Sequence, residues 1–306
     1  MRVVLISFFS LISIHILSQN QLSVVSGKIE HVSVFPSKYT DPRTIDIWLP
    51  DGYSEEKKYS VIYMHDGQML FDSSTTWNKQ SWDVDDKLTQ LLKDKEIKNT
   101  IVVGIWNNGV NRHAEYFPQK PFESFSKQEK DSISIELQRI GRTDSFFMPI
   151  SDNYLKCIVE EIKPMIDETF AVRKGRKHTF IMGSSMGGLI SLYAICEYPK
   201  VFGGAACLST HWPGIFKLEN NPIPNAFINY LKHNLPSPRL HKLYFDCGDQ
   251  TLDSLYPEIQ MQVNRVLIEA GYSSKNCLTK YFPGNDHSEA SWKKRLNFPL
   301  IFLLKN

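Results

Sequence analysis

The fold predicted for this chain is decided by the stretch Thr179-Phe180-Ile181-Met182-Gly183-Ser184-Ser185-Met186-Gly187-Gly188-Leu189-Ile190. A short apolar run ends at Met182, a Gly-x-Ser-x-Gly turn follows, and apolar residues then recur at helical spacing. Strand, tight turn and helix in this order are typical of a nucleophile elbow, which lifts a serine hydroxyl above a parallel sheet. We expect glycine at 183 and 187 because a Cβ there would collide with neighbouring backbone. Ser185 is the candidate nucleophile.

Strand-like and helix-like segments alternate around this turn. Strands are predicted over 27–34, 44–49, 60–65, 100–106, 178–182, 203–209, 242–247 and 277–282. Helices are predicted over 82–92, 154–167, 186–198, 224–232, 256–270 and 291–304. The first two strands alternate polar and apolar residues as edge strands do, whereas several others are continuous apolar runs typical of buried parallel strands. The pattern predicts an α/β fold, a sheet of eight mostly parallel strands with helices on both faces.

Residues 107–152 interrupt this alternation, because they form a long, polar stretch with little periodicity. A stretch of this length between sheet elements is usually functional or flexible. It follows the fourth strand, at the sheet edge where ligands bind in α/β folds. We therefore expect a cap-like insertion that acts as a lid over the active site, with a mobile surface excursion as the alternative.

Composition limits the classes of function. With 306 residues, 42% of them hydrophobic, the chain can bury the core of one large domain. Its net charge is +2 and its basic residues are scattered, so nucleic acid binding is not expected. The five cysteines favour buried thiols, although Cys207 and Cys247 end strands expected to be neighbours and leave one disulfide open. No spacing predicts a metal site, and no cofactor is expected.

Residues 1–19 have the features of a secretory signal peptide. Arg2 precedes an apolar run from Val3 to Leu17, and the small residue Ser18 follows. The run is shorter than the about 20 residues of a membrane-spanning helix, and an uncleaved anchor is the alternative. We expect a mature hydrolase domain over 20–306 that is secreted or periplasmic, with no stable membrane insertion after cleavage. The sequence does not predict its oligomeric state.

A serine nucleophile needs a base, and an acid that orients the base. In α/β-hydrolases the acid and then the base follow the serine along the chain. His287 lies directly after the last strand and is the candidate base, whereas His211 follows the sixth strand. The loop after the seventh strand offers Asp249 and Asp253 as the acid. Asp253 is favoured because it lies just before the next helix beside Leu252, and Asp249 is a plausible turn former.

Two backbone N–H groups are predicted to stabilise the developing oxyanion. One belongs to Met186, which follows the nucleophile at a helix N-terminus. The other belongs to Gly67 or Gln68 in the loop after the third strand, and we assign it to Gln68. The neighbouring His65-Asp66 pair lacks further ligands and is not read as a metal site.

Substrate-binding residues are predicted at the same edge of the sheet. Tryptophan at a strand end offers a stacking face for a sugar ring or an aryl group, and ordinary packing under loops is the alternative. We assign Asp66, Trp106, His211 and Trp212 to substrate binding. Trp77, which follows the third strand, is expected to offer a stacking face as well, and Asn107, Arg112, Glu115 and Tyr116 are expected to line the same rim.

Three segments carry a family resemblance: Tyr63-Met64-His65-Asp66-Gly67-Gln68-Met69-Leu70-Phe71-Asp72, Gly183-Ser184-Ser185-Met186-Gly187-Gly188, and Gly284-Asn285-Asp286-His287-Ser288-Glu289 with Trp292. Together they resemble the putative-esterase family of α/β-hydrolases, which includes enterochelin esterase-like proteins, feruloyl and acetyl-xylan esterases, esterase D and mycolyltransferases. The resemblance covers nearly the whole mature chain and implies Ser185 as nucleophile and His287 as base. Similar bacterial sequences have Gly-Thr and then Leu-Asp after the seventh strand, which favours Asp253, and Asp249 replaces that threonine here.

These observations predict a serine carboxylic-ester hydrolase that works through an acyl-enzyme on Ser185. The expected substrate is a small-molecule or oligosaccharide ester, with feruloyl or acetyl groups on carbohydrate favoured by the signal peptide and the tryptophans. A siderophore esterase of the enterochelin type and an acyltransferase are alternatives within the same chemistry. A non-catalytic glycan-binding protein of the same fold is the alternative from another class.

Overall fold

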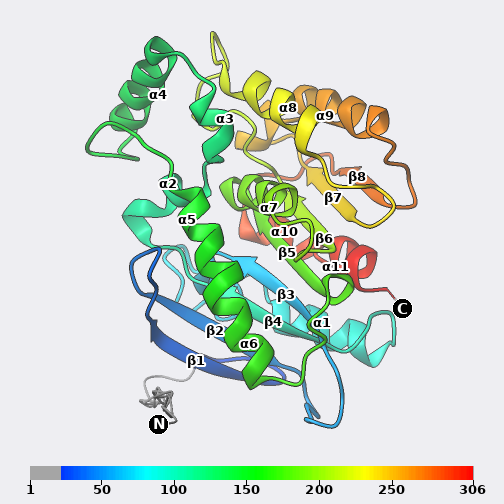
Figure 1. Cartoon of the computed structure of the whole chain (residues 1–306). Helices are drawn as coiled ribbons and strands as arrows, with labels where there is room; N and C mark the ends of the chain where they lie inside the picture. Colours follow the sequence, from blue (N-terminus) through cyan, green and yellow to red (C-terminus); the bar gives the residue numbers. More distant parts are fainter. Residues whose placement is uncertain (1–21, 306) are drawn as a thin grey trace, which may run out of the picture.

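The computed structural model describes residues 22–305, which are arranged around one eight-stranded sheet (Figure 1). The strands are β1 (Lys28–Phe35), β2 (Arg43–Leu49), β3 (Ser60–His65), β4 (Thr100–Ile105), β5 (Thr179–Ser184), β6 (Gly204–Leu208), β7 (Lys242–Cys247) and β8 (Cys277–Tyr281). Their spatial order is β1-β2-β4-β3-β5-β6-β7-β8. The pairs β1–β2 and β2–β4 are antiparallel, and all the others are parallel. The predicted α/β class and the mostly parallel sheet are confirmed, with strand bounds that differ by at most two residues.

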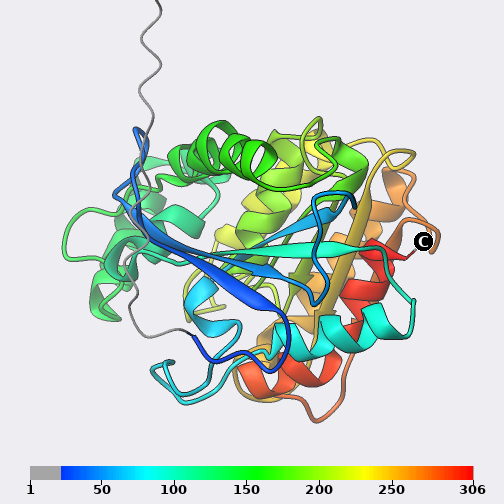
Figure 2. The ribbon, with the colours of Figure 1, turned by 90° about the horizontal axis from the view of Figure 1, so that it is seen from below.

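Helices cover both faces of this sheet. They are α1 (Val84–Lys93), α2 (Arg112–Tyr116), α3 (Gln119–Glu123), α4 (Lys127–Arg139), α5 (Ser151–Lys156), α6 (Lys163–Thr169), α7 (Met186–Glu197), α8 (Ile223–Asn234), α9 (Pro257–Glu269), α10 (Glu289–Arg295) and α11 (Asn297–Leu304). A π-helical turn (157–162) joins α5 to α6. One apolar core lies between the sheet and α5 to α9, and a second lies between the opposite face and α1, α10 and α11. Figure 2 shows α1 and α11 together on their side of the sheet.

The predicted helices are present, with two differences. The helix expected over 154–167 consists of α5, the π-helical turn and α6. The other difference is at the end of the chain. The single helix expected over 291–304 is divided into α10 and α11 at Leu296. Leu296 and Leu300 are fully buried against the second core. The division lets α10 follow the loop after β8 while α11 packs along α1.

The insertion over 107–152 is more regular than its sequence pattern predicts. It contains the 3-10 turn 109–111 and the helices α2, α3 and α4. Helices α2 and α3 have five residues each, too few to give a periodic signal. For α4 a signal is present in the sequence, since Ser126 and Glu129 form a capping box at its start. The sequence signal for α4 is thus its N-terminal cap and not a periodic pattern.

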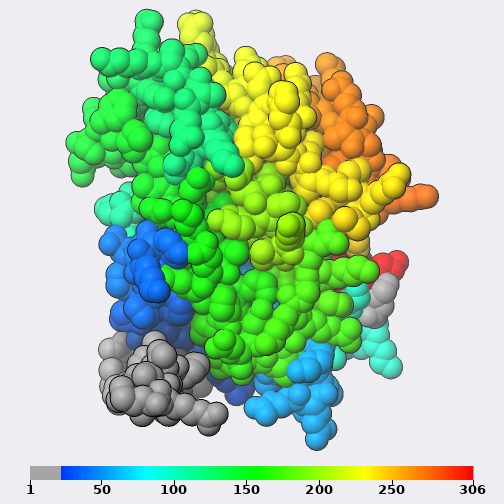
Figure 3. All heavy atoms as spheres, in the orientation of Figure 1, coloured from blue at the N-terminus to red at the C-terminus, as the bar shows by residue number. Residues whose placement is uncertain are grey.

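Aromatic packing holds the insertion on the domain. Phe117, Phe122 and Phe147 pack edge to face on one another, and Phe117 also contacts Phe227 of α8. All four rings are buried. In the space-filling view the insertion forms a lobe of the surface beside α8 (Figure 3).

Three other sequence predictions concern features outside the sheet. The expected signal peptide, residues 1–19, lies outside the described residues. All five cysteines carry free thiols, so the disulfide left open between Cys207 and Cys247 is not formed. Within residues 22–305, none of the helices combines the length and the hydropathy required to cross a membrane.

Candidate active site

Ser185 lies on a strained turn between β5 and α7. Its φ is 58° and its ψ is −123°, a conformation that is costly for a residue with a Cβ and that is concentrated at functional sites. Hydrogen bonds to the neighbouring strand hold the turn. The N–H of Ser185 donates to the carbonyl of Leu208 at 2.9 Å, and its carbonyl accepts from the N–H of His211 at 3.1 Å. This geometry is that of the elbow that the sequence predicts.

The two glycines of the elbow differ in what they allow. A Cβ on Gly183 would lie 2.8 Å from the carbonyl carbon and oxygen of Gly187, so strand and helix backbones touch there. A Cβ on Gly187 would meet nothing closer than the Cβ of His65 at 3.4 Å, an ordinary contact. The expected collision is therefore found at Gly183 and not at Gly187.

His287 and Asp253 form a direct pair beside this turn. Nδ1 of His287 lies 2.6 Å from Oδ1 of Asp253. The backbone N–H of His287 also donates to the hydroxyl of Thr251 at 3.0 Å. The rings of Trp292 and Tyr256 meet the imidazole edge to face at 5.0 and 5.8 Å between centroids. The imidazole is thus fixed in position and in orientation.

Asp253 is fully buried, and its second oxygen is also satisfied. Oδ2 accepts hydrogen bonds of 2.6 Å from the hydroxyl of Ser209 and from the N–H of Gly248. Burial alone would raise the pKa of Asp253. The hydrogen bond and the charge of His287, and the hydrogen bonds from Ser209 and Gly248, instead hold this pKa below its ordinary value. Asp249 instead accepts from the N–H of Gly284 and the hydroxyl of Tyr281. The structure thus brings Asp253 to His287, and not Asp249.

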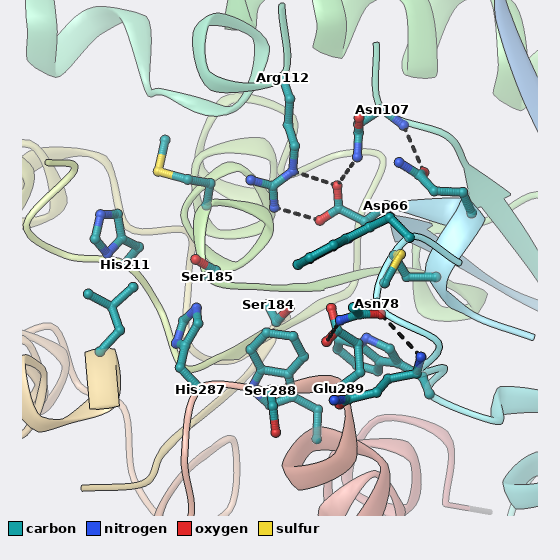
Figure 4. Close-up of a pocket in the computed structure, with 18 of the residues that line it drawn as sticks. Asp66, Asn78, Asn107, Arg112, Ser184, Ser185, His211, His287, Ser288 and Glu289 are labelled. Atoms are coloured by element: carbon teal, nitrogen blue, oxygen red, sulfur yellow. Dashed lines mark hydrogen bonds and ion pairs between the residues drawn. The ribbon is translucent and has the colours of Figure 1, made fainter. Parts of the chain in front are cut away.

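Ser185 and His287 face the same cavity, which has a volume of about 500 Å³ (Figure 4). No hydrogen bond joins the two side chains among the described residues. Contacts between a nucleophile and its base are often loose until a substrate binds.

The two predicted oxyanion donors also line this cavity. Met186 is the first residue of α7, where backbone N–H groups have no partner within the helix. Gln68 is the middle residue of a 3-10 turn, 67–69, directly after β3. A Cβ on Gly67 would lie 2.6 Å from the carbonyl carbon of Gly104, so only glycine lets this turn lie against β4.

The carboxylate of Asp66 is engaged by the insertion. Arg112 donates to it through Nε and Nη2, both at 2.7 Å, and Asn107 donates through Nδ2 at 2.7 Å. Burial would raise the pKa of Asp66, but the charge and hydrogen bonds of Arg112 hold it below its ordinary value. The hydroxyl of Tyr116 accepts from the N–H of Asp66 at 3.2 Å. Asp66 lines the cavity, as expected, but its contacts anchor the Gly67-Gln68 turn to α2 (Figure 4).

Of the three tryptophans expected to offer a stacking face, Trp77 lines the cavity, whereas Trp106 and Trp212 do not. The indole N–H of Trp106 donates to Oδ2 of Asp46 at 2.5 Å, on β2, and Trp106 is absent from the cavity wall. Trp212 is buried and donates to Oε1 of Gln260 at 3.1 Å. The assignment of these two residues to substrate binding is therefore not supported, because neither lines the cavity and both indole N–H groups donate to residues outside it. The cavity is lined by Trp77, Trp82 and Trp292.

Other rim residues divide in the same way. Asn107 and Arg112 line the cavity, as expected. Glu115 is buried in an ion pair with Arg43 at 2.7 Å, and Tyr116 is buried beneath Asp66, so neither reaches the cavity wall.

His211 lies at the cavity in the predicted position. Its Nδ1 is 2.9 Å from the hydroxyl of Tyr256. Burial lowers the pKa of His211 well below its ordinary value, so the imidazole is neutral at neutral pH and suits hydrogen bonding rather than ion pairing.

Sequence reasoning missed several cavity residues that have no local motif. Asn78, Arg142 of the insertion and Phe216 line the cavity with the predicted residues. They lie in loops distant in sequence, so no spacing pattern could have grouped them. The residues described by the structure contain no cluster of three His, Cys, Asp or Glu side chains that could hold a metal ion.

The family model described as "Putative esterase" matches residues 37–136 and 148–303 of this chain. Among curated proteins, the uncharacterised protein YbbA of Bacillus subtilis is 26% identical over 172 residues, which cover 56% of this chain and 58% of that protein. The endo-1,4-beta-xylanase/feruloyl esterase of Xylanibacter ruminicola is 22% identical over 285 residues, 88% of this chain and 30% of that protein. The chain therefore spans less than two thirds of the length of these relatives.

Solved structures share the fold. A ferulic acid esterase superimposes with a TM-score of 0.64 at 19% identity, covering 91% of this chain and 98% of the other. The enterobactin esterase of Shigella flexneri superimposes with a TM-score of 0.63 at 17% identity, covering 92% of this chain and 60% of the other. At these identities the similarity establishes the fold alone.

Proposed function

The chain belongs to the putative esterase family, and from this premise we propose that the protein is a serine hydrolase of carboxylic esters. One observation carries the proposal. The strained turn of Ser185 and the imidazole of His287 lie at the same cavity, and His287 is hydrogen-bonded to the buried Asp253 behind it. A nucleophile, a base and an acid that orients the base are the three groups that acyl transfer needs.

The proposed reaction has two halves. Oγ of Ser185 attacks the ester carbonyl while His287 takes the hydroxyl proton and Asp253 stabilises the imidazolium. The N–H groups of Met186 and Gln68 stabilise the negative charge on the carbonyl oxygen. The C–O bond to the alcohol breaks, and His287 returns the proton to the leaving oxygen. Water then attacks the acyl-enzyme by the same route and releases the acid and the free serine.

The proposed substrate is an ester on carbohydrate, with a feruloyl or acetyl group as the acyl part. Trp77 supports this proposal, because its side chain is 83% exposed at the cavity and offers a face for stacking a sugar ring. Polar side chains that suit sugar hydroxyls line the same cavity: Asn78, Gln80 and Glu289. Nδ2 of Asn78 donates to Glu289 at 2.8 Å, which holds these two side chains together. Phe216 and Leu252 offer apolar surface in the same cavity for the acyl group.

The insertion over 107–152 is proposed to act as the cap of this site. It supplies Asn107, Arg112, His113 and Arg142 to the cavity wall, which supports a role in enclosing the substrate. Export is a separate proposal that rests on the sequence of residues 1–19. Mass spectrometry of the protein recovered from the native host tests it: a mature chain that begins at residue 20 supports cleavage, and an intact residue 1 contradicts it.

The test of the mechanism is hydrolysis of p-nitrophenyl acetate and butyrate by the wild type and by Ser185→Ala. We expect turnover that is lost in the variant, together with covalent labelling by a fluorophosphonate detected as an intact-mass increase. Ser184→Ala is the matched control, because it removes the adjacent hydroxyl and is expected to keep the label. Labelling of Ser185→Ala, or turnover that survives in it, would contradict the assignment of the nucleophile.

Substrate class is tested by comparing kcat/KM on feruloylated and acetylated xylo-oligosaccharides with kcat/KM on a catecholate siderophore trilactone. A preference for the oligosaccharides supports the proposal, and a preference for the trilactone replaces it with the siderophore alternative. Transfer of the acyl group to a sugar alcohol in preference to water would assign an acyltransferase. Glycan binding without turnover or labelling would favour the non-catalytic alternative.

A further inference from the structure

Ser209 is a fully buried serine that directly follows β6, behind the His287–Asp253 pair. Its φ is 42°, in the left-handed region that favours glycine. Its backbone N–H donates to the carbonyl of Asp246 at 2.8 Å. A serine kept in a conformation that glycine would adopt more easily indicates that the hydroxyl has a role.

The hydroxyl of Ser209 has three hydrogen-bond partners. Oγ lies 2.6 Å from Oδ2 of Asp253, 2.9 Å from Nε1 of Trp292 and 2.6 Å from Nη2 of Arg295. The indole N–H and the guanidinium are donors only, so the hydroxyl accepts from both. Its single proton must then be donated to Asp253. All the hydrogen-bonding capacity of the hydroxyl is used, and its direction is fixed.

We propose that Ser209 is a positioning residue that orients the carboxylate of Asp253, and through it the imidazole of His287. The inference rests on the proposed function, because it assigns Asp253 and His287 to the reaction. Ser209 does not touch the cavity, so it acts only through Asp253.

Trp292 joins both ends of this arrangement. Its indole N–H donates to Ser209, and its ring meets His287 edge to face at an interplanar angle of 84°. The imidazole of His287 therefore contacts both Asp253 and Trp292, and Ser209 is hydrogen-bonded to each of these two residues. A change at Ser209 is expected to disturb both contacts of His287.

Arg295 gives the arrangement its charge balance. Its Nη2 lies 3.0 Å from Oδ1 of Asp246 and 3.7 Å from Oδ2 of Asp253. The cation thus stands between two buried carboxylates. The titratable groups that face Asp253 come from four segments of the chain: His287 after β8, Arg295 of α10, Asp246 and Cys247 of β7, and Tyr256 before α9.

Two variants separate the hydroxyl from the backbone strain. Ser209→Gly removes the hydroxyl and relieves the positive φ, whereas Ser209→Ala removes the hydroxyl and keeps the strain. Ser60→Ala is the matched control, because Ser60 is also a buried serine but lies at the opposite end of the sheet. Its hydroxyl contacts only His178, at 3.3 Å.

For both Ser209 variants we expect kcat on p-nitrophenyl butyrate to fall about 10- to 100-fold, by analogy with the loss of outer-shell hydrogen bonds that orient metal ligands. KM should stay within about twofold, because the cavity wall is unchanged. The acidic limb of the kcat/KM profile should move to higher pH, since Asp253 loses a donor that stabilises its charged form. Ser60→Ala should keep the wild-type kcat and the wild-type limb.

A spectroscopic reading tests the inference even without turnover. A proton held between His287 and Asp253, whose atoms are 2.6 Å apart, is expected to give a far-downfield NMR signal, identified by its loss in His287→Ala. We expect this signal in the wild type and in Ser60→Ala, and its shift or loss in folded Ser209→Gly.

Three results would overturn the inference. Ser209→Gly that is folded with unchanged kcat and unchanged signal would show that the hydroxyl positions nothing. Activity that falls only with the folded fraction, without a move of the pH limb, would assign a structural role. If the wild type has no esterase activity and the signal is the same in folded Ser209→Gly, both this inference and the proposed function are refuted. If the wild type has no esterase activity but the signal shifts in folded Ser209→Gly, only the proposed function is refuted.

Discussion

Replacing Arg112 by methionine tests whether the insertion holds the Gly67-Gln68 turn, which carries a proposed oxyanion donor. The variant removes the two hydrogen bonds of 2.7 Å that Arg112 donates to the carboxylate of Asp66, and only Asn107 remains as a side-chain donor. Breaking a buried ion pair costs about 3–5 kcal/mol of the free energy of unfolding. The side chains of Arg112 and Asp66 are 28% and 14% exposed, so solvent screening reduces the expected cost to about 2–3 kcal/mol.

The cost should depend on pH in a defined direction. In the wild type the pKa of Asp66 is lowered, so its contribution is present above the unfolded pKa and is lost as the pH falls through the folded pKa. In Arg112→Met the main opposing cause is gone, and burial raises the pKa of Asp66. The destabilisation is therefore largest at neutral pH and shrinks in acid, where the Asp66 carboxyl of the folded variant is neutral and no longer a buried, unpaired charge.

Urea unfolding at neutral pH and at about pH 4 measures this difference. Arg139→Met is the matched control, because its pair with Glu136 is an exposed i,i+3 pair of the same insertion and should change stability by less than about 0.5 kcal/mol. We also expect Arg112→Met to lower kcat about 10-fold or more, because Gln68 lies on the released turn. Equal destabilisation at both pH values, or an unchanged kcat, would refute the reasoning.

Three further predictions concern the elbow, the rim and the buried core. Gly183→Ala places a Cβ 2.8 Å from the backbone of Gly187, so kcat should fall with a loss of about 1–3 kcal/mol in unfolding free energy; wild-type turnover on a p-nitrophenyl ester would contradict the contact. Trp77→Ala should raise KM for an oligosaccharide ester and leave kcat/KM for p-nitrophenyl acetate unchanged, and equal effects on both substrates would exclude a sugar-stacking role. Arg43→Met leaves Glu115 unpaired, and since both side chains are only 1% exposed, urea unfolding should show a loss of about 3–5 kcal/mol; a loss below about 1 kcal/mol would contradict the burial of the pair.

Local pattern was sufficient for most of the framework of this protein. The strands are apolar runs bounded by polar residues, and the elbow has glycine where backbones meet, as at Gly183. Both signals depend on neighbours in sequence. The order of Ser185, Asp253 and His287 could likewise be read from the chain, because parallel strands carry their following loops to one edge of the sheet.

The choice between Asp253 and Asp249 shows where local pattern reaches its limit. Both residues lie in the loop after β7, four positions apart. The choice depends on which carboxylate meets His287, and β8 and the loop after it determine where that histidine lies. The sequence favoured Asp253 through turn position and family resemblance, but contact with the histidine is a tertiary property.

Trp106 and Trp212 show the same limit, because the sequence predicted them at the cavity and the structure does not place them there. Trp106 and Trp212 follow strands at the expected edge, yet their indole N–H groups are taken by Asp46 and Gln260. Whether an aromatic side chain faces a cavity or a core depends on which polar partner lies within reach, and those partners are 60 and 48 residues away.

The sequence by itself determined the α/β class, the position of the elbow and the residue types of the proposed triad, because these depend on periodicity and on steric limits of the backbone. Only the tertiary structure decided the partner of His287, the engagement of Asp66 by Arg112 and the contacts of Ser209. The physical reason is that hydrogen bonds of 2.6–2.7 Å between distant segments depend on how the loops pack at the edge of the sheet, and no local pattern encodes that packing.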